Sequence, residues 1–288
     1  MEKIKFAFKN LINNLYGRAN WQRINYSILK GSIGLASINI NPAIPRTWEF
    51  SSFSQNGEDG ISNFLTNNII SPNKYFIEIG TSDGIENNTA FFAFVKKYSG
   101  LMIEGDYKAS YNSKRILHNT NLGVTCINKF ITKYNSHEII EVSRYSNPDI
   151  FSIDIDGIDF YVLKSLFEKG LNPAIVIVEY NSTFGPTNSI TVEYNDNFDI
   201  SKEHDTRLYY GVSINAWITY FNSIGYKFIT VDSNGINAFF VDPKRFSNDF
   251  LDKIKPVYFN ENIFEINKFK MTHDERFDLI KHLKYTSV

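Results

Sequence analysis

The stretch that decides the fold is Tyr75–Thr89, YFIEIGTSDGIENNT. Apolar residues lead into the acidic Glu78, a loop from Gly80 to Gly84 follows, and an Asn-Asn-Thr triplet precedes the next apolar run. This pattern predicts a strand, a glycine-bent loop and the start of a helix. Glycine has no Cβ and tolerates positive φ, so such a loop lets backbone N–H groups approach a ligand closely. We therefore expect the floor of a nucleotide-like cofactor site here.

Length and composition favour one α/β domain with additions. The 288 residues are 43% hydrophobic, and the formal net charge of -1 gives no general attraction to nucleic acid. The single cysteine, Cys126, excludes an intramolecular disulfide and fits a reducing cytoplasm. The longest apolar run, Ala90–Val95, is far shorter than the ~20 residues of a membrane-spanning helix. We therefore predict a cytoplasmic protein with neither a transmembrane helix nor a signal peptide, and no nucleic-acid partner.

The first 30 residues are strongly basic, with six lysines and arginines and one acidic residue. Their apolar residues fall on one helical face: Ile4, Phe8, Leu11, Ile12 and Leu15. One interpretation is peripheral docking on an anionic surface at the inner face of the membrane, or on a partner. The favoured interpretation is packing on its own domain or on a second subunit of a homodimer, because such stripes usually face a core. Pro42 and Pro45 break the pattern, so we place the helical extension and its linker at residues 1–48.

A second helix is predicted after the polar segment Ser54–Asp59, because Ile61, Phe64, Leu65 and Ile69 follow at helical spacing. Glu58 and Asp59 would lie in its first turn, where carboxylates interact favourably with the helix dipole. We interpret both acids as capping residues. The less favoured alternative is that Ser54 and Gln55 face the cofactor.

The next acidic strand end is Glu104, in the segment GLMIEGD, 20 residues after Gly84. In α/β nucleotide-binding proteins an acid at this position holds the ribose diol, because one carboxylate can accept hydrogen bonds from two vicinal hydroxyls. We therefore assign Glu104 to a ribose and place Asp106 beside it in the cofactor site.

Four aspartates fall within eleven residues after a predicted third strand at residues 124–131 and a helix at 136–143: Asp149, Asp154, Asp156 and Asp159. Carboxylates at the end of an apolar strand need a cation, N–H donors or solvent. Asp159 most simply begins the helix of residues 160–168. Asp154 and Asp156 point the same way if the strand continues, and so line one site.

Pro173–Asn181 is the clearest strand in the sequence, a continuous apolar run typical of a central parallel strand. Ligands of open parallel sheets bind beyond the carboxyl ends of the strands. The polar residues at those ends should therefore meet at one edge of the sheet: Glu78, Glu104, Asp154, Asp156, Glu179 and Asn181.

Residues 182–207 show no clear period and are predicted as a long loop or lid that carries His204 and Asp205 as acid/base candidates. Solvent exposure of His204 is an equally weighted alternative. Beyond the loop we expect a helix over residues 214–221 and a hairpin of residues 226–232 and 238–242. The aromatic-rich tail, residues 246–288, should end in a helix carrying Phe277, Ile280 and Leu283 and pack on the domain.

These segments together resemble the FkbM-type branch of class I S-adenosylmethionine-dependent methyltransferases over about residues 53–242. The resemblance is carried by SQNGEDG, FIEIGTSDGIENNT, LMIEGD, FSIDIDGIDFYVL, IVIVEYN, YYGVSINAW and NAFFV. It implies a Rossmann-like three-layer sandwich with a seven-stranded, mostly parallel sheet whose last strand is antiparallel, spanning residues 49–245. The DIDGID segment departs from the single acid-glycine pattern of many members, and residues 1–48 have no counterpart in the family.

The resemblance implies S-adenosylmethionine as cofactor, held by the first loop and by Glu104. We assign to the cofactor Glu78, Gly80, Ser82, Asp83, Gly84, Asn88, Glu104, Asp106 and Asp154. We assign catalysis to Asp156, Glu179 and His204, and acceptor binding to Asn181 and Tyr210. The loop agrees with this assignment, because Gly-x-x-x-Gly lacks the second glycine of the dinucleotide fingerprint and the sequence has no P-loop.

An acidic edge suits methyl transfer in two ways, and the sequence leaves both open. Asp154, Asp156, Glu179 and Asn181 offer an oxygen shell for Mg²⁺, which would lower the pKa of an acceptor hydroxyl. The slightly favoured alternative is that Asp154 and Asp156 bind the amino group of the cofactor and orient the acceptor directly.

We expect an O-methyltransferase acting on a sugar hydroxyl of a surface glycan or a nucleotide-linked sugar. Two alternatives are a non-catalytic binding or assembly protein of glycan synthesis on the same fold, and a methyltransferase of a small metabolite, because fold alone does not secure function.

Overall fold

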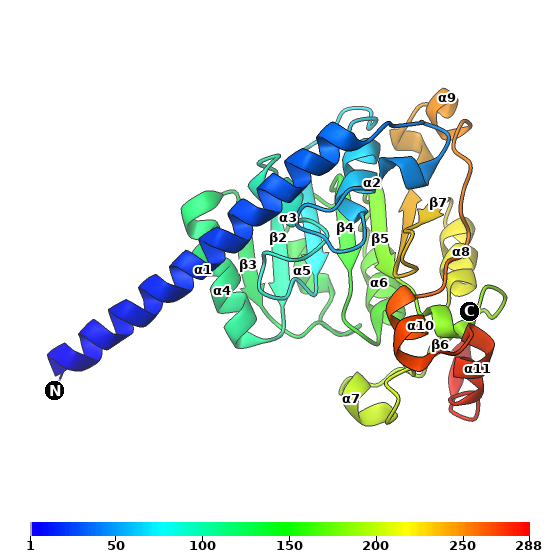
Figure 1. The fold of residues 1–288 in the computed structure, drawn as a ribbon. Helices are drawn as coiled ribbons and strands as arrows, with labels where there is room; N and C mark the ends of the chain where they lie inside the picture. Colours follow the sequence, from blue (N-terminus) through cyan, green and yellow to red (C-terminus); the bar gives the residue numbers. More distant parts are fainter. Residues whose placement is uncertain (1) are drawn as a thin grey trace.

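The computed structural model describes the backbone of residues 2–288 and the side chains of residues 17–288. Its centre is a seven-stranded sheet (Figure 1). The strands are β1 (Tyr75–Ile79), β2 (Ser99–Glu104), β3 (Val124–Asn128), β4 (Ile150–Ile153), β5 (Ile175–Glu179), β7 (Lys227–Val231) and β8 (Asn237–Val241). Their order in space is β3-β2-β1-β4-β5-β8-β7.

The direction of the strands confirms the predicted fold class. β1 to β5 pair in parallel, whereas β8 runs antiparallel to both of its neighbours, β5 and β7. The chain builds outward from β1 to β3 and then returns to place β4 on the other side of β1. In open α/β sheets such a reversal leaves a crevice outside the carboxyl ends of the two central strands.

Two layers of helices cover the sheet because alternate strand residues face opposite sides. Phe76 packs in one buried cluster with residues of α2 (Glu58–Thr66), α3 (Ala90–Phe94) and α4 (Tyr107–Thr120). The next residue, Ile77, packs in a second cluster with residues of α5 (His137–Val142), α6 (Asp159–Glu168) and α8 (Ile214–Ser223). The apolar runs of the strands are therefore buried on both faces, as expected for a central parallel sheet.

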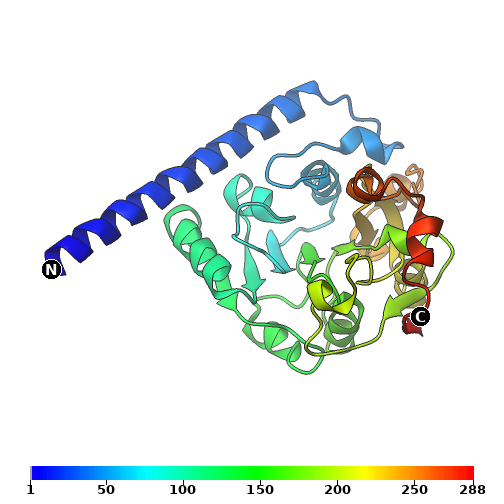
Figure 2. The same cartoon turned by 60° about the horizontal axis from the view of Figure 1, so that its bottom comes forward.

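A single long helix, α1 (Glu2–Ser37), precedes the domain and is followed by the short 3-10 helix η1 (Pro45–Trp48). Figure 1 and Figure 2 both show α1, in blue, running along one side of the body with its N-terminal part projecting past the sheet. The predicted apolar stripe of Ile4, Phe8, Leu11, Ile12 and Leu15 lies outside the described side chains. Ile24 is a buried apolar residue in the described part of the helix, at 3% exposure.

The C-terminal region differs from its prediction. The predicted loop of residues 182–207 contains the 3-10 helix η2 (Ser182–Phe184), β6 (Ile190–Val192) and α7 (Ile200–Glu203). The chain ends in a strand, β9 (Tyr285–Ser287), which pairs with β6, whereas we predicted a terminal helix. The helix α11 (His273–Asp278) stops before Ile280, which is buried with Phe184 and Val192. The remaining elements are η3 (Pro243–Arg245), α9 (Asn248–Leu251) and α10 (Ile263–Phe269).

No helix in the described part of the chain is both long and apolar enough to cross a membrane.

A buried ion cluster fastens this C-terminal region to the domain. The guanidinium of Arg276, which is fully buried, lies 3.3 Å from a carboxylate oxygen of Glu265 and 3.2 Å from one of Glu261. Arg276 also donates to the hydroxyl of Thr183 in η2. Removing one partner of a buried ion pair leaves the other charge uncompensated, which is strongly destabilising.

We therefore expect Arg276→Ala to lower the free energy of unfolding by about 3–5 kcal/mol, measured by urea denaturation. The matched control is Lys281→Ala, which removes an exposed cation that pairs with Asp278 and should change stability by no more than about 0.5 kcal/mol. Equal losses in the two variants would contradict the special weight given to the buried cluster.

Candidate functional site

The site begins where the loop after β1 touches the loop after β4. Gly80 has a φ of 87°, and a Cβ added to it would lie 1.7 Å from the carbonyl oxygen of Asp154. Any side chain at position 80 would therefore push the two central strand ends apart. The Gly80 N–H also donates to the carbonyl of Ile103 in β2, so this glycine contacts loops or strands on both sides of β1.

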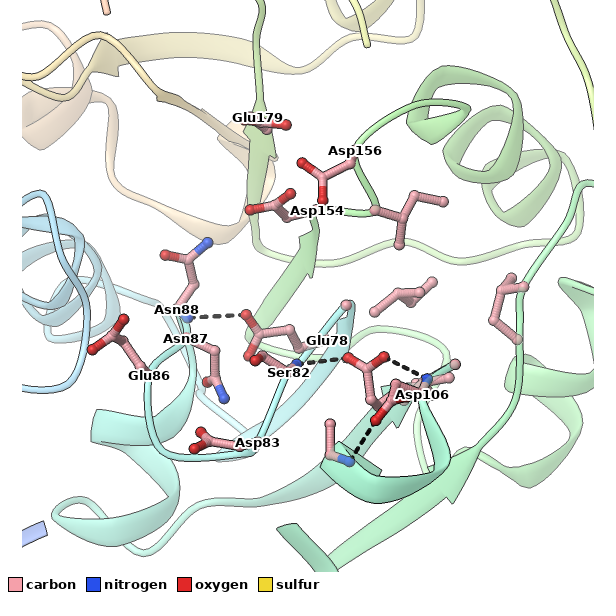
Figure 3. Close-up of a pocket in the computed structure, with 18 of the residues that line it drawn as sticks. Glu78, Ser82, Asp83, Glu86, Asn87, Asn88, Asp106, Asp154, Asp156 and Glu179 are labelled. Atoms are coloured by element: carbon pink, nitrogen blue, oxygen red, sulfur yellow. Dashed lines mark hydrogen bonds between the residues drawn. The ribbon is translucent and has the colours of Figure 1, made fainter. Parts of the chain in front are cut away.

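A cavity of about 900 Å³ opens at this edge of the sheet. Its walls come from the loops after β1, β2, β3 and β4 and from the end of β5, together with Ser54–Asn56 and one residue of α1, Arg23. Figure 3 shows the carboxylates of Asp154, Asp156 and Glu179 gathered on one side of this cavity and Ser82, Asp83 and Asp106 on the other. The convergence of the strand ends predicted from the sequence is therefore observed for five of the six polar residues, with Asn181 absent from the lining.

Glu104 lies in the lining at the end of β2, and its orientation is fixed by two backbone donors. One carboxylate oxygen accepts from the N–H of Ser82 at 2.7 Å and the other from the N–H of Asp106 at 2.8 Å. A carboxylate has about four lone-pair positions, so acceptor capacity remains for a ligand. Glu104 thus links the glycine loop to the start of α4 and remains part of the cavity wall.

Glu78 borders the cavity, but its carboxylate is occupied by the protein. It accepts from the N–H groups of Asn88 and Thr89 at 2.9 and 3.1 Å and from the Thr89 hydroxyl. Burial raises the pKa of Glu78 to about 7, against these hydrogen bonds, which lower it. Asn88 in turn donates its side-chain amide to the hydroxyl of Ser152 in β4. Glu78 therefore holds the loop after β1 in place by accepting hydrogen bonds from Asn88 and Thr89.

The other predicted cofactor residues take different positions around the same loop. Ser82 and Asp83 line the cavity, and Asp83 forms an ion pair with Arg23 of α1. Asp106 lines it as well, and its side chain caps α4 by accepting from the N–H of Ala109. Gly84 does not line the cavity, and its small size is required because an added Cβ would lie 2.4 Å from the hydroxyl of Ser113.

The acid cluster is formed by Asp154, Asp156 and Glu179, whose carboxylate oxygens lie within 4.8 Å of one another. We predicted that Asp154 and Asp156 would share a side because the strand continued, but β4 ends at Ile153. A turn brings them together instead, with Asp156 in the left-handed region at a φ of 55°. Burial and the neighbouring carboxylates raise the pKa values of Asp154 and Glu179 well above the ordinary range.

The turn that carries Asp156 is held by Asp159. As predicted, Asp159 begins α6, and its carboxylate also accepts from the N–H groups of Ile155 and Gly157, both at 2.9 Å. Burial raises the pKa of Asp159 to about 6, while these two backbone donors lower it. Asp159 therefore has a structural role in placing the acid cluster.

Three predicted residues lie away from the cavity. Asn181 is fully buried, and its amide donates to the carbonyls of Leu208 and Tyr210. Tyr210 is buried, and burial and the neighbouring Glu179 raise the pKa of its hydroxyl well above the ordinary value. His204 directly follows α7, and its Nδ1 forms a hydrogen bond with the hydroxyl of Thr206 at 2.8 Å. The amide of Asn181 thus ties a loop to the strand end, and none of the three residues lines the cavity.

Sequence reasoning missed Asn237 and gave Ser54 and Gln55 only as the less favoured candidates for facing the cofactor. All three residues line the cavity. Asn237 begins β8 and lies opposite Glu179 in the antiparallel register. Its amide nitrogen donates to Glu58 at 2.8 Å, whereas its carbonyl oxygen is buried without a partner. The sequence offered no signal for Asn237, because its position depends on how β8 pairs with β5.

The lining is strongly acidic. It contains two basic residues, Arg23 and Lys129, which already pair with Asp83 and Glu138. The acids in the lining are Glu58, Glu78, Asp83, Glu86, Glu104, Asp106, Asp154, Asp156, Glu179 and Asp196. A cavity lined by one sign of charge concentrates ions of the opposite sign and disfavours anions.

The solved structures to which the chain is similar include methyltransferases. The chain is similar to an O-methyltransferase from Bacillus cereus in complex with SAH (14% identity, 76% of this chain and 89% of the other, TM-score 0.39). It is also similar to an O-methyltransferase from Streptomyces achromogenes involved in tomaymycin synthesis, in complex with SAM (12%, 75% and 95%, TM-score 0.41). A putative O-methyltransferase from Klebsiella pneumoniae is a third (15%, 76% and 97%, TM-score 0.40).

No family model and no curated protein matches the sequence. The fold assignment rests on the strand order and direction of this chain itself.

We expect Gly80→Ala to lower the free energy of unfolding by about 2–4 kcal/mol, because it combines an unfavourable positive φ with a backbone clash. Gly170→Ala is the matched control, since Gly170 has a φ of 98° but nothing within 4 Å of its added Cβ. That control should cost about 1–2 kcal/mol, measured by the same urea denaturation. Equal costs would show that the contact with Asp154 is unimportant.

Proposed function

We propose that this chain is an S-adenosylmethionine-dependent O-methyltransferase whose acceptor is a sugar hydroxyl. The observation that carries the proposal is one cavity with Glu104 in one wall and the acid cluster in another, on a sheet with this strand order. Glu104 suits a ribose, and the acid cluster suits a cationic methyl donor and a hydroxyl acceptor.

The adenosine would lie over the loop of residues 80–84, with its ribose hydroxyls donating to the free lone pairs of Glu104. Since Ser82 and Asp106 already fix that carboxylate, little side-chain entropy is lost on binding. The sulfonium and the amino group of the cofactor would then point toward Asp154, which borders the same cavity. The negative lining favours both positive groups.

In the reaction the acceptor oxygen attacks the methyl carbon, the carbon–sulfur bond breaks, and the hydroxyl proton passes to a carboxylate. Asp156 and Glu179 are the proposed bases, and the raised pKa of Glu179 brings it nearer to the range of an efficient base. The protein supplies alignment of oxygen, methyl and sulfur, an effect that can be worth about 7–11 kcal/mol.

The charge of the cavity favours a neutral glycan over a nucleotide-linked sugar as acceptor. A diphosphate would need cationic partners, and both basic residues of the lining are engaged in ion pairs. A neutral sugar carries hydroxyls that can donate to the surrounding carboxylates. We therefore place the acceptor among neutral glycans or small neutral polyols.

Mg²⁺ is the alternative occupant of the acid cluster. Asp154, Asp156 and Glu179 fit it. Asn237, which lies opposite Glu179 in the sheet register and has an unpartnered side-chain oxygen, would be the fourth donor. Asn181 does not fit, because its side-chain oxygen accepts from the N–H of Thr183 and the residue lies outside the cavity lining. When bound, the ion would lower the pKa of the acceptor hydroxyl. Without it, the carboxylates hold the cofactor amino group and take the proton, which is the arrangement that we favour.

The cofactor assignment predicts that S-adenosylmethionine and S-adenosylhomocysteine both bind and that Glu104→Ala weakens binding roughly tenfold to a hundredfold in calorimetry. Glu141→Ala, which removes an exposed acid on α5, is the control and should bind as the unaltered protein does. Absence of binding by the unaltered protein would favour the non-catalytic alternative. Full affinity in Glu104→Ala would overturn the ribose assignment.

Whether a divalent cation takes part in methyl transfer is tested separately. We expect that chelation leaves S-adenosylmethionine binding and methyl transfer to neutral oligosaccharides unchanged, because the carboxylates act directly. The direct readout is Mn²⁺ titration followed by electron paramagnetic resonance. Tight Mn²⁺ binding that is lost in Asn237→Ala, together with activity restored by Mg²⁺ after chelation, would establish the ion and overturn our preference.

A further inference from the structure

The helix α1 contacts the domain through small residues. The residues of its partly or fully buried side recur at spacings of three and four: Gly17, Asn20, Ile24, Ser27, Gly31, Gly34 and Ile38, the last just beyond the helix end. A Cβ added to Gly31 would lie 2.3 Å from the hydroxyl of Ser52, and one added to Gly34 would lie 3.0 Å from the Cβ of Phe50. The helix therefore lies close against the body along a seam with few large apolar side chains.

Three large apolar residues in the described part of α1 face the other way. Tyr26, Leu29 and Ile33 are 69%, 63% and 70% exposed, and their spacing of three and four residues places them on the face opposite the seam. Trp21 is 49% exposed near one edge of that face. Packing on the domain, which the sequence analysis favoured, accounts for the small residues and for Ile24. It leaves the apolar face of the helix without a partner among the described residues.

The charge of this segment indicates what covers that face. Residues 1–30 carry six lysines and arginines and a single acidic residue, although the whole chain has a formal net charge of -1. Arg23 is already paired with Asp83 of the domain, so it does not count toward attraction to a surface. A second copy of the chain would bring two such basic segments together, and the like charges would repel. An anionic phospholipid surface attracts them instead, by about 1 kcal/mol per basic residue near the surface.

We propose that α1 is a membrane-surface helix that lies on an anionic phospholipid bilayer, with Tyr26, Leu29 and Ile33 among the inserted side chains. Such a helix lies in the interface plane and does not span the bilayer. The described part of the chain contains no helix suited to spanning. This docking goes beyond the proposed function and does not depend on it.

The test is co-sedimentation of the full chain with vesicles of phosphatidylcholine alone and with equimolar phosphatidylglycerol and phosphatidylcholine. We expect binding to the anionic vesicles only, weakened by raised salt because the attraction is partly electrostatic. The variant Leu29→Ser/Ile33→Ser should bind at least roughly tenfold more weakly. The matched control, Leu122→Ser/Val142→Ser, removes two exposed apolar residues elsewhere on the domain, 79% and 57% exposed, and should bind as the unaltered protein does.

Three outcomes overturn the proposal. One is the absence of binding of the unaltered protein to anionic vesicles. Another is equal binding by Leu29→Ser/Ile33→Ser, checked for native folding by circular dichroism. The third is a dimer in light scattering that Leu29→Ser/Ile33→Ser abolishes while vesicle binding is absent, which would assign the face to a second copy.

Discussion

The structure depends on the close approach of Gly80 to the carbonyl of Asp154. This contact joins the two strands, β1 and β4, between which the chain reverses its direction of building the sheet. It sets the distance between the loop that would hold a cofactor and the turn that carries the acid cluster. A cavity with opposing walls of defined chemistry exists because no side chain separates these two backbones.

Six acidic residues of the domain divide into two groups with different surroundings. Glu78, Asp59 and Asp159 are buried, and each accepts two or more backbone N–H groups, so they fix loops in place. Asp154, Asp156 and Glu179 have oxygens close together at the cavity instead. Clustered carboxylates without donors are costly, since burial and like charges disfavour ionisation. Of these six acids, only Asp154, Asp156 and Glu179 therefore offer their charge to a ligand, although all six look alike in sequence.

Much of the fold could be predicted from the sequence, because the apolar runs of β1, β2, β4 and β5 are local signals that each end in an acid. The positions of residues that depend on contacts between segments far apart in the sequence could not be predicted. Asn237 reaches the cavity only through the register of β8 against β5, and Arg23 reaches it only because α1 packs beside the loop after β1. Asn181 follows a strand end as expected, yet its amide satisfies backbone carbonyls of a loop that the sequence left undefined. The terminal strand β9 was missed because it forms only against β6.

The ion pair between Arg23 and Asp83 has a consequence for regulation. Arg23 belongs to the helix with the exposed apolar face, and Asp83 belongs to the loop proposed to hold the cofactor. If seating α1 on a surface changes, through this pair, the affinity of the loop for its proposed cofactor, then cofactor binding must change the affinity of the helix for that surface by the same factor. Attachment of α1 to a surface and binding of the proposed methyl donor at the loop would then be thermodynamically coupled, so that each would respond to the other.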